Sequence, residues 1–339
     1  MDKNNSTSTV EKSTFLKVYC SNHTISTSLG VLLNGYLILV IYKCTRRSNQ
    51  QVNLILMAST LNDLMFSLFE LLLQHVIYQS DGIMYIISYG FDQNVGSNLK
   101  LILSCAHYFA LIQVMTMQAA LHSYRYLIIS QERPPTRRDF IRRYILFSIP
   151  SIYLSVSYSV SAYYGLKHSV SHYTKTLPTA WQNSDGSNNV SYVTLWSDPA
   201  TKFYVFNNVV VVAALFDTSM FYIYKCYKHV NTGYEKVSAS TQKMRSQFNR
   251  CLISQTLVIA VLALIPSGII SMTYALQLHG TYLGAPSMMG FAWFGAINAL
   301  IPLLYMDAFR NYSIRLIFCS KQVEIDNSVA TTRSLVSVS

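Results

Sequence analysis

Five polar side chains in an otherwise apolar stretch of this chain could form an interacting network. They recur at intervals of four, four, three and four residues: Ser59, Asp63, Ser67, Glu70 and Gln74. Such intervals place side chains on one face of an α-helix. If residues 53 to 78 cross a membrane, Asp63 lies about 15 Å deep, at about 1.5 Å of rise per residue. An unpaired carboxylate is costly at that depth, so Asp63 should be protonated, hydrated or paired.

Two interpretations of these polar groups stay open. One is a network that switches between two packings of a helix bundle, and the other is a set of static hydrogen bonds between helices. Three acidic residues, Asp63, Glu70 and Asp217, fall in apolar stretches that we expect to be buried in one bundle, which favours the network. Asn34, in a further apolar stretch, is assigned to it as well.

A second polar row ends at Arg125, directly after an apolar run. Counting back at helical spacing gives the residues on its face: Leu121, Gln118, Val114, Leu111 and His107. A guanidinium offers five donors in a planar fork, which suits it to bind polar groups of a partner. Alternatively, Arg125 only extends toward lipid headgroups, as basic residues at helix ends often do. The spacing alone does not separate these alternatives.

The composition indicates what must hold these side chains. Of the 339 residues, 51% are hydrophobic and 12% are charged, whereas about a quarter are charged in a typical soluble domain. Seven runs are long enough to cross about 30 Å of hydrocarbon, which takes about 20 residues each. They span residues 24–43, 53–78, 101–129, 144–165, 203–224, 252–278 and 285–306. The sequence therefore predicts an all-α membrane protein with a seven-transmembrane helix bundle.

Basic residues indicate the orientation of this bundle. Of the 26 lysine and arginine residues, 19 fall on the side of the first, third and fifth connections between the seven runs and of the carboxyl terminus. Since cytosolic segments carry the excess of positive charge, we expect the amino terminus outside and the carboxyl terminus in the cytosol. The net charge of +11 is dispersed in short blocks, which favours membrane topology over binding to nucleic acid.

This orientation divides the chain into four segments. Residues 1–23 are expected to be extracellular, 24–306 to form the bundle, 307–319 to form a helix on the membrane surface, and 320–339 to be a disordered cytosolic tail. The sequons on the outer side predict glycosylation at Asn4, Asn5, Asn22 and Asn189. A disulfide between Cys20 and Cys105 and acylation of Cys319 are left open.

Short motifs in order along the chain resemble those of G-protein-coupled receptors. They are Asn34-Gly35, Leu61-Asn62-Asp63-Leu64, Tyr124-Arg125-Tyr126 and Pro302-Leu303-Leu304-Tyr305. The Tyr-Arg-Tyr ending, together with Gln255-Thr256-Leu257 and Pro266-Ser267-Gly268, is similar to the nematode Str-superfamily chemoreceptors of the str and srd type. The resemblance covers nearly all of the chain.

The resemblance implies a receptor that couples a small-molecule ligand to a heterotrimeric G protein. It assigns the coupling switch to Tyr124, Arg125, Tyr126, Asn298, Pro302 and Tyr305. Two positions depart from the receptor pattern, since Tyr124 replaces an acidic residue and Ile301 replaces the polar residue before the proline. We expect Asn298 to supply the missing polar group. The expected location is the plasma membrane, in contact with lipid, with a sensory cilium as one candidate compartment.

The resemblance also places the ligand pocket in the outer half of the bundle. The candidates that could line it are His107, Tyr108, Asn207, Tyr274 and Trp293. Residues 285–306 contain no lysine that could attach retinal, and no cofactor is expected. The histidines do not follow the spacing of a metal site, so neither a metal nor an enzymatic activity is predicted. A heptahelical ligand-gated channel and an ion-coupled transporter stay open as alternatives; the charge distribution and the absence of an internal repeat argue against them.

Overall fold

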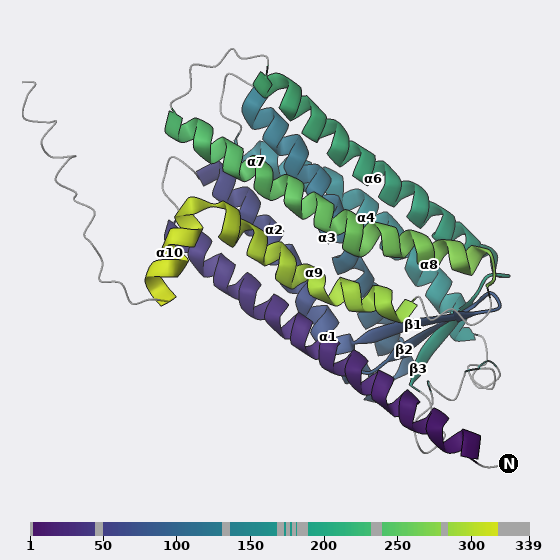
Figure 1. The fold of residues 1–339 in the computed structure, drawn as a ribbon. Coiled ribbons are helices and arrows are strands. Elements are labelled where there is room, and N and C mark those ends of the chain that lie inside the picture. Colours follow the sequence, from purple (N-terminus) through teal and green to yellow (C-terminus); the bar gives the residue numbers. More distant parts are fainter. Residues whose placement is uncertain are drawn as a thin grey trace, which may run out of the picture.

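A bundle of long helices forms the body of the molecule (Figure 1). The computed structural model describes residues 3–44, 50–130, 136–167, 173, 177, 181, 189–231, 239–278 and 284–317. Within these residues, seven helical spans are long and apolar enough to cross a membrane. Six of them run along α1 (Lys3–Cys44), α2 (Gln50–Leu73), α3 (Ser97–Ser130), α4 (Arg137–Lys167), α6 (Pro199–Asn231) and α9 (Gly284–Tyr305). The remaining span combines α7 (Ala239–Ile259), η5 (Ala260–Leu264) and α8 (Ile265–Ala275).

The composite span changes its winding next to a proline. Pro266 lacks a backbone N–H and its ring crowds the preceding turn. The five residues before Ile265 form a short π-helical segment, η5, so that α7 and α8 continue each other around this defect. Such segments often mark functional positions in helices.

A three-stranded antiparallel sheet closes one end of the bundle, hereafter the sheet end. Its strands are β1 (His75–Ser80), β2 (Ile83–Ser88) and β3 (Val190–Leu195), in the order β1-β2-β3. Asp81 and Gly82 join β1 to β2 with φ angles of 53° and 73°. Positive φ at both central residues is the requirement of a tight type I′ hairpin, and Asp-Gly satisfies it.

The sheet corrects the predicted extent of the second span. The sequence predicted a helix through residue 78, but α2 ends at Leu73 and β1 begins at His75. Gln74 turns the chain with a φ of 46°. The apolar residues after it belong to a buried strand, which hydropathy alone does not distinguish from a helix.

Two glycines allow the sheet to lie directly on helix ends. A Cβ atom at Gly165 of α4 would lie 2.0 Å from the carbonyl oxygen of Val193, and one at Gly284 of α9 would lie 2.1 Å from that of Ile77. Only a residue without a side chain permits such an approach. The sheet is therefore fixed against α4 and α9 and covers the space between the helices.

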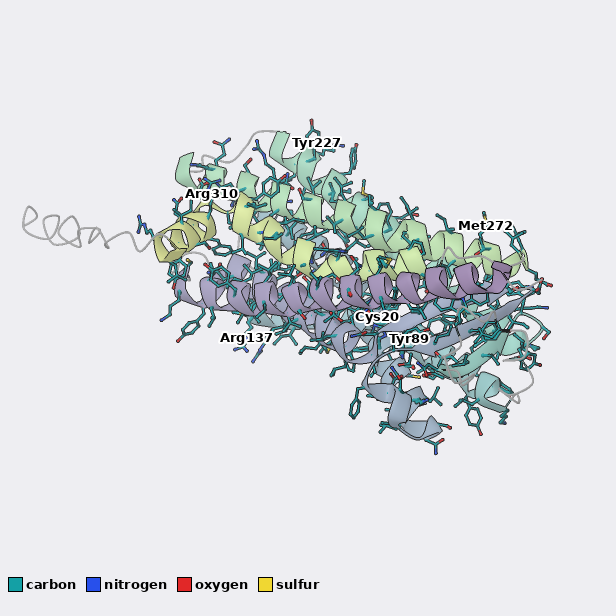
Figure 2. All side chains as sticks on the ribbon, turned by 60° about the horizontal axis from the view of Figure 1, so that its bottom comes forward. Cys20, Tyr89, Arg137, Tyr227, Met272 and Arg310 are labelled. Carbon is teal, nitrogen blue, oxygen red and sulfur yellow. The ribbon has the colours of Figure 1, made fainter. Side chains whose placement is uncertain are left out.

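The opposite end of the bundle, hereafter the basic end, carries α10 (Asp307–Ile317). Figure 1 shows α10 turning away from the end of α9, and Figure 2 shows Arg137 and Arg310 toward this end, away from Met272. Phe309 of α10 is buried, and Tyr36 of α1 donates a hydrogen bond to Ser313 at 2.8 Å. The helix thus corresponds to most of the expected surface segment 307–319. The predicted tail 320–339 and Cys319 lie outside the described residues.

Candidate functional site

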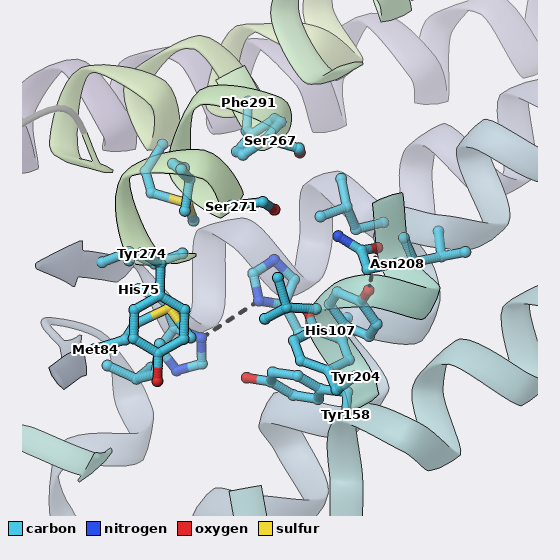
Figure 3. Close-up of a pocket in the computed structure, with 18 of the residues that line it drawn as sticks. His75, Met84, His107, Tyr158, Tyr204, Asn208, Ser267, Ser271, Tyr274 and Phe291 are labelled. Carbon is cyan, nitrogen blue, oxygen red and sulfur yellow. Dashed lines mark hydrogen bonds between the residues drawn. The ribbon is translucent and has the colours of Figure 1, made fainter. Parts of the chain in front are cut away.

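A cavity of about 110 Å³ lies between the helices beneath the sheet. Its walls come from β1, β2, α3, α4, α6, α8 and α9. The aromatic side chains on it are Tyr108, Tyr158, Tyr204, Tyr274 and Phe291, and the polar ones include His75, His107, Ser104, Asn208, Ser267 and Ser271. Figure 3 shows the two histidines facing each other in this space, with Tyr158 and Tyr204 close to His107. Aromatic walls with a few convergent polar groups are typical of small-molecule sites.

Three tyrosines from different helices form one wall of the cavity. The rings of Tyr108 and Tyr158 stack with centroids 4.4 Å apart, and the ring of Tyr204 meets both edge-on at 5.7 Å and 5.4 Å. Tyr108 donates a hydrogen bond to Asn208 Oδ1 at 2.8 Å, and the hydroxyl of Tyr158 bonds that of Tyr192 on β3. These contacts fix the rings, so the wall is preformed.

The predicted ligand residues divide into two groups. His107, Tyr108 and Tyr274 line the cavity. Asn207 instead accepts a hydrogen bond from Tyr153 at 2.7 Å on the outer surface of the bundle, and its neighbour Asn208 lines the cavity. Trp293 donates a hydrogen bond to Asn22 of α1 at 3.1 Å, away from this space. A helix turns about 100° per residue, so neighbouring residues of α6 point in different directions. An error of one position therefore exchanges a side chain in the cavity wall for one on the outer surface.

A chain of buried acids and histidines starts at the cavity wall and runs behind it. The imidazole of His107 lies 3.0 Å from Glu70 Oε1 through Nε2 and 3.4 Å from His75 Nδ1 through Nδ1. His75 Nε2 lies 3.0 Å from Asp92 Oδ2 on η2 (Phe91–Asn94). On the far side, His23 Nε2 of α1 lies 2.9 Å from Glu70 Oε2. The chain joins α1, α2, α3, β1 and η2 at the sheet end.

Two members of this chain lie outside the membrane-spanning helices. Burial lowers the pKa of His75 below its usual range, although the carboxylate of Asp92 acts in the opposite direction. Burial alone would raise the pKa of Asp92, but the imidazole of His75 and the hydroxyl of Ser88 outweigh it and hold this pKa below its usual range. Asp92 is thus an ionised carboxylate at neutral pH.

A second polar cluster occupies the middle of the bundle. Asn298 Nδ2 of α9 donates to Asp63 Oδ2 of α2 at 2.5 Å, and Gln255 of α7 donates to the carbonyl of Asn298 at 3.3 Å. Asn34 of α1 donates to the carbonyl of Gly295 at 3.0 Å. A Cβ atom at Gly295 would lie 2.0 Å from Ser67 Oγ, so the glycine brings α9 close to α2. The structure therefore joins Asn34, Asp63 and Asn298 in one region.

Asp217 is a correction to the predicted network. Its side chain is exposed on the outer surface of α6 rather than buried in the bundle. Glu70 is buried, but it belongs to the histidine chain at the sheet end rather than to the cluster around Asp63. The sequence rule that acidic residues in membrane helices point inward holds for two of these three acids.

Arg125 lies inside the basic end, only 4% exposed. Its guanidinium donates a hydrogen bond to Asn249 of α7 and lies 5.9 Å from the ring centre of Phe248. Of the alternatives open from the sequence, the inward-facing arginine agrees with this position better than one extended toward headgroups. Its side-chain hydrogen-bond acceptor among the described residues is Asn249.

The other predicted switch residues differ in how deeply they are buried. Tyr124 is buried against Phe140, Tyr126 is half-buried against Tyr222, and Pro302 is buried in α9. Tyr305 is 39% exposed.

Several residues of both sites had no assignment from the sequence. They are His75, Ser104, Tyr158, Tyr204, Asn208 and Asn249. Ser104 lies one helical turn before His107, and this spacing was a usable signal. His75 reaches the cavity because it lies on a strand of the hairpin. The dipeptide Asp81-Gly82 is the sequence signal that indicates this hairpin.

The predicted glycosylation sites lie on α1 and directly before β3. Asn189 precedes β3, and its carbonyl accepts a hydrogen bond from the backbone of Ser88. Asn22 is half-buried in α1 and engaged by Trp293. Asn4 and Asn5 lie on α1, but their side chains are outside the described part of the structure. Cys20 and Cys105 are free thiols, and no disulfide joins them.

Comparisons with known proteins agree with this architecture. The crystal structure of squid rhodopsin superposes with a TM-score of 0.58 over 95% of this chain and 92% of that chain, at 12% sequence identity. At this identity the similarity shows the fold alone, and it confirms the seven-helix membrane bundle. No curated protein matches the sequence. The model of the serpentine type 7TM GPCR chemoreceptor family Str matches residues 21–314. The chain therefore belongs to the Str family of serpentine seven-transmembrane chemoreceptors.

Proposed function

We propose that this protein is a chemosensory receptor of the plasma membrane, in which a small molecule in the cavity promotes activation of a heterotrimeric G protein at the basic end. The observation that carries the proposal is Arg125, which is buried and held by Asn249. Among the described residues, Asn249 is the one side-chain acceptor of this guanidinium, and it is neutral. A buried guanidinium held in this way is poorly compensated, so a second packing of the helices can compete with this one. The cavity lies at the other end of the same helices.

The composite helix connects the two sites. Ser267, Ser271 and Tyr274 of α8 line the cavity, whereas Asn249 of α7 holds Arg125. The π-helical segment η5 lies between them, at the junction where this helix is least regular. A ligand that draws α8 toward α3 would tilt α7 about this junction and release Arg125. Such a ligand needs only to bind one packing better than the other.

Charge supports the orientation that this mechanism requires. Arg137, Arg142, Arg250 and Arg310 all lie at the basic end, as expected for the cytosolic side. The same cations would attract anionic lipid and acidic surfaces of a G protein. The sheet and the cavity then face the exterior, where an odorant or pheromone arrives.

A ligand screen in cells that express the receptor tests the proposal. Cyclic-nucleotide or calcium signals are recorded with and without functional heterotrimeric G proteins. We expect ligand responses to disappear when the G proteins are disabled. An ionic current that persists without them would contradict the proposal and favour the ligand-gated channel.

A further inference from the structure

Counting protons in the acid and histidine chain gives its charge. Glu70, His107, His75 and Asp92 are joined by three hydrogen bonds, and each bond needs one proton. Two neutral imidazoles supply two protons, and two carboxylates supply none. The contact between the two Nδ1 atoms therefore requires a third proton. With it, the four side chains carry a net charge of −1.

His23 lies on the far side of Glu70 and is not part of the cavity wall. Its Nε2 faces Glu70, and its Nδ1 is buried without a hydrogen-bond partner among the described residues. No lysine or arginine is among the described residues that line the cavity. The negative charge next to the cavity thus has no fixed positive partner in its wall.

Further titratable groups surround the histidine pair. They are Tyr19 and His23 on α1, Glu70 on α2, Cys105 and Tyr108 on α3, Asp92 on η2, Tyr158 on α4, Tyr204 on α6 and Tyr274 on α8. The described lining residues of β2 and α9 add no titratable group. The tyrosines are neutral, and their rings offer negative faces that attract cations.

A third acceptor lies beside the histidine pair. Ser104 lines the cavity one helical turn from His107, is 1% exposed, and its Oγ has no hydrogen-bond partner in the part of the chain that the structure describes. A buried polar atom without a partner is unusual, and in a cavity wall it indicates a group that meets a ligand. His75 Nδ1, His107 Nδ1 and Ser104 Oγ together offer three acceptors once the third proton leaves.

We propose that the cavity binds a small primary amine in its ammonium form, and that the ammonium replaces the proton shared by His75 and His107. This inference rests on the proposed role of the cavity as the ligand site. An ammonium group has three N–H donors, which match the three acceptors. On binding, the two rings separate, one proton is released to solvent, and the ammonium takes over the positive charge of that proton, so the net charge of the site stays at −1. The apolar part of the ligand lies against Tyr108, Tyr158 and Tyr204.

The size of the cavity limits the ligand. An apolar cavity of about 150 Å³ in another protein holds benzene, and this one measures about 110 Å³. The ligand should therefore have no more than about six non-hydrogen atoms, and n-butylamine is a suitable probe.

Calorimetry on the purified receptor in lipid nanodiscs tests this inference. Titration of n-butylamine at neutral pH in two buffers of different ionisation enthalpy gives the number of protons released per ligand. We expect about one proton, and an affinity that rises up to about tenfold per pH unit while the amine stays protonated. The controls 1-butanol and butyrate, of similar length, should bind at least about tenfold more weakly. Absence of amine binding, or binding without proton release, overturns the inference.

Two variants and one control separate the groups involved. His75→Asn should bring proton release close to zero, because the shared proton is lost with the imidazole. Ser104→Ala should weaken amine binding about tenfold and leave the proton count at one. Ser219→Ala should change neither value, because this hydroxyl donates to the carbonyl of Leu215 within α6 and does not line the cavity. If His75→Asn fails to fold, the Ser104→Ala and Ser219→Ala pair decides, and equal effects of these two variants count against the site.

The outcome can be distinguished from that of the proposed function. A receptor that signals through G proteins to neutral molecules but binds no amine would overturn the ligand class alone. One that binds n-butylamine with proton release but never activates a G protein would overturn the proposed function alone.

Discussion

At the scale of single residues, Arg125 has an unusual partner for the coupling role proposed for it. The acidic residue that would pair with this arginine in many receptors is replaced by Tyr124, whose hydroxyl has no hydrogen-bond partner among the described residues. Asn249 of α7 provides a neutral acceptor instead. A neutral acceptor holds a guanidinium less strongly than a carboxylate does. The balance between resting and active packings is therefore expected to be sensitive to changes at position 249.

Replacement of Arg125 tests its role in coupling. Arg125→Ala should abolish G-protein signalling, whereas surface level and ligand binding stay largely intact. Arg125→Lys should restore signalling only partly, because it keeps the charge and loses the planar fork. Dose-response curves at matched surface expression measure this difference. Full signalling by Arg125→Lys would show that only a positive charge is needed.

Replacement of Asn249 tests the restraint on Arg125. Loss of a hydrogen bond to a charged group costs about 1.5–3 kcal/mol, or about tenfold or more in an equilibrium constant. Asn249→Ala should therefore raise ligand-independent signalling, and Asn249→Asp should lower it by forming an ion pair. Basal signalling per receptor at the cell surface is the quantity to compare. Equal basal activity in both variants would rule out this contact as the restraint.

Asp63 tests whether the central polar cluster switches. Asp63→Asn keeps the size and hydrogen-bonding capacity of the side chain but removes the charge next to Asn298. We expect surface expression to persist and the ligand response to change in strength. If expression collapses and no change in response can be separated from that loss, the contact is a static one between helices.

At the scale of elements, the cap at the sheet end is held by ionic as well as backbone bonds. Asp92 of η2 accepts hydrogen bonds from His75 of β1 and Ser88 of β2, so it ties the hairpin to the turn that leads into α3. His75 also lies in the cavity wall. The stability of the cap and the shape of the cavity are thus linked through one imidazole.

The lowered pKa of Asp92 predicts a dependence of this cap on pH. The folded state binds the carboxyl proton less readily than the unfolded state. The stabilisation is therefore fully present above the ordinary aspartate pKa of about 4 and is lost as the pH falls through the folded-state value. Asp92→Asn should lower stability by about 1.5–3 kcal/mol at neutral pH. Thermal unfolding in nanodiscs should show a lower unfolding temperature for Asp92→Asn than for the unchanged protein at pH 6 to 7, and this difference should become smaller toward pH 3. A difference that does not change with pH would exclude a contribution from the charge of Asp92.

The elements also show how far the sequence can predict the structure. The seven spans follow from hydropathy because each is a long, nearly uncharged run. The sheet did not follow, because His75 to Tyr78 continues the apolar run of α2 without a break in composition. The turn at Gln74 has a positive φ, which neither hydropathy nor helical periodicity reports. The second partner of β2 is β3, which lies more than 100 residues away, and such a pairing leaves little local signal.

The lining of the cavity was partly predictable for a related reason. His107, Tyr108 and Tyr274 line the cavity, and they occur near the expected outer ends of their helices. Asn207 and Asp217 were misplaced because α6 carries apolar residues on its outer surface as well as its inner one. In lipid, hydrophobicity does not distinguish these two surfaces, so the rotation of the helix stays undetermined from the sequence.

At the scale of the whole molecule, the function requires a definite orientation across the membrane. The cavity and the sheet lie at one end, and Arg125, α10 and the clustered arginines lie at the other. A receptor for external chemicals must place the first end outside and the second in the cytosol. Two sequons lie at opposite ends of the molecule, Asn189 beside β3 and Asn311 on α10, and they allow a test within one chain.

Glycosylation and epitope tags should report the same orientation. We expect Asn189→Gln to remove a glycan and Asn311→Gln to have no effect, because only the outer side meets the glycosylation machinery. Tags at the amino terminus and between α4 and β3 should stain on intact cells, and a carboxyl-terminal tag should stain only after permeabilisation. Since membrane-spanning helices cross in alternation, staining of the carboxyl-terminal tag on intact cells would reverse every connection. The cavity would then open to the cytosol, and the protein could not act as a receptor for external chemicals.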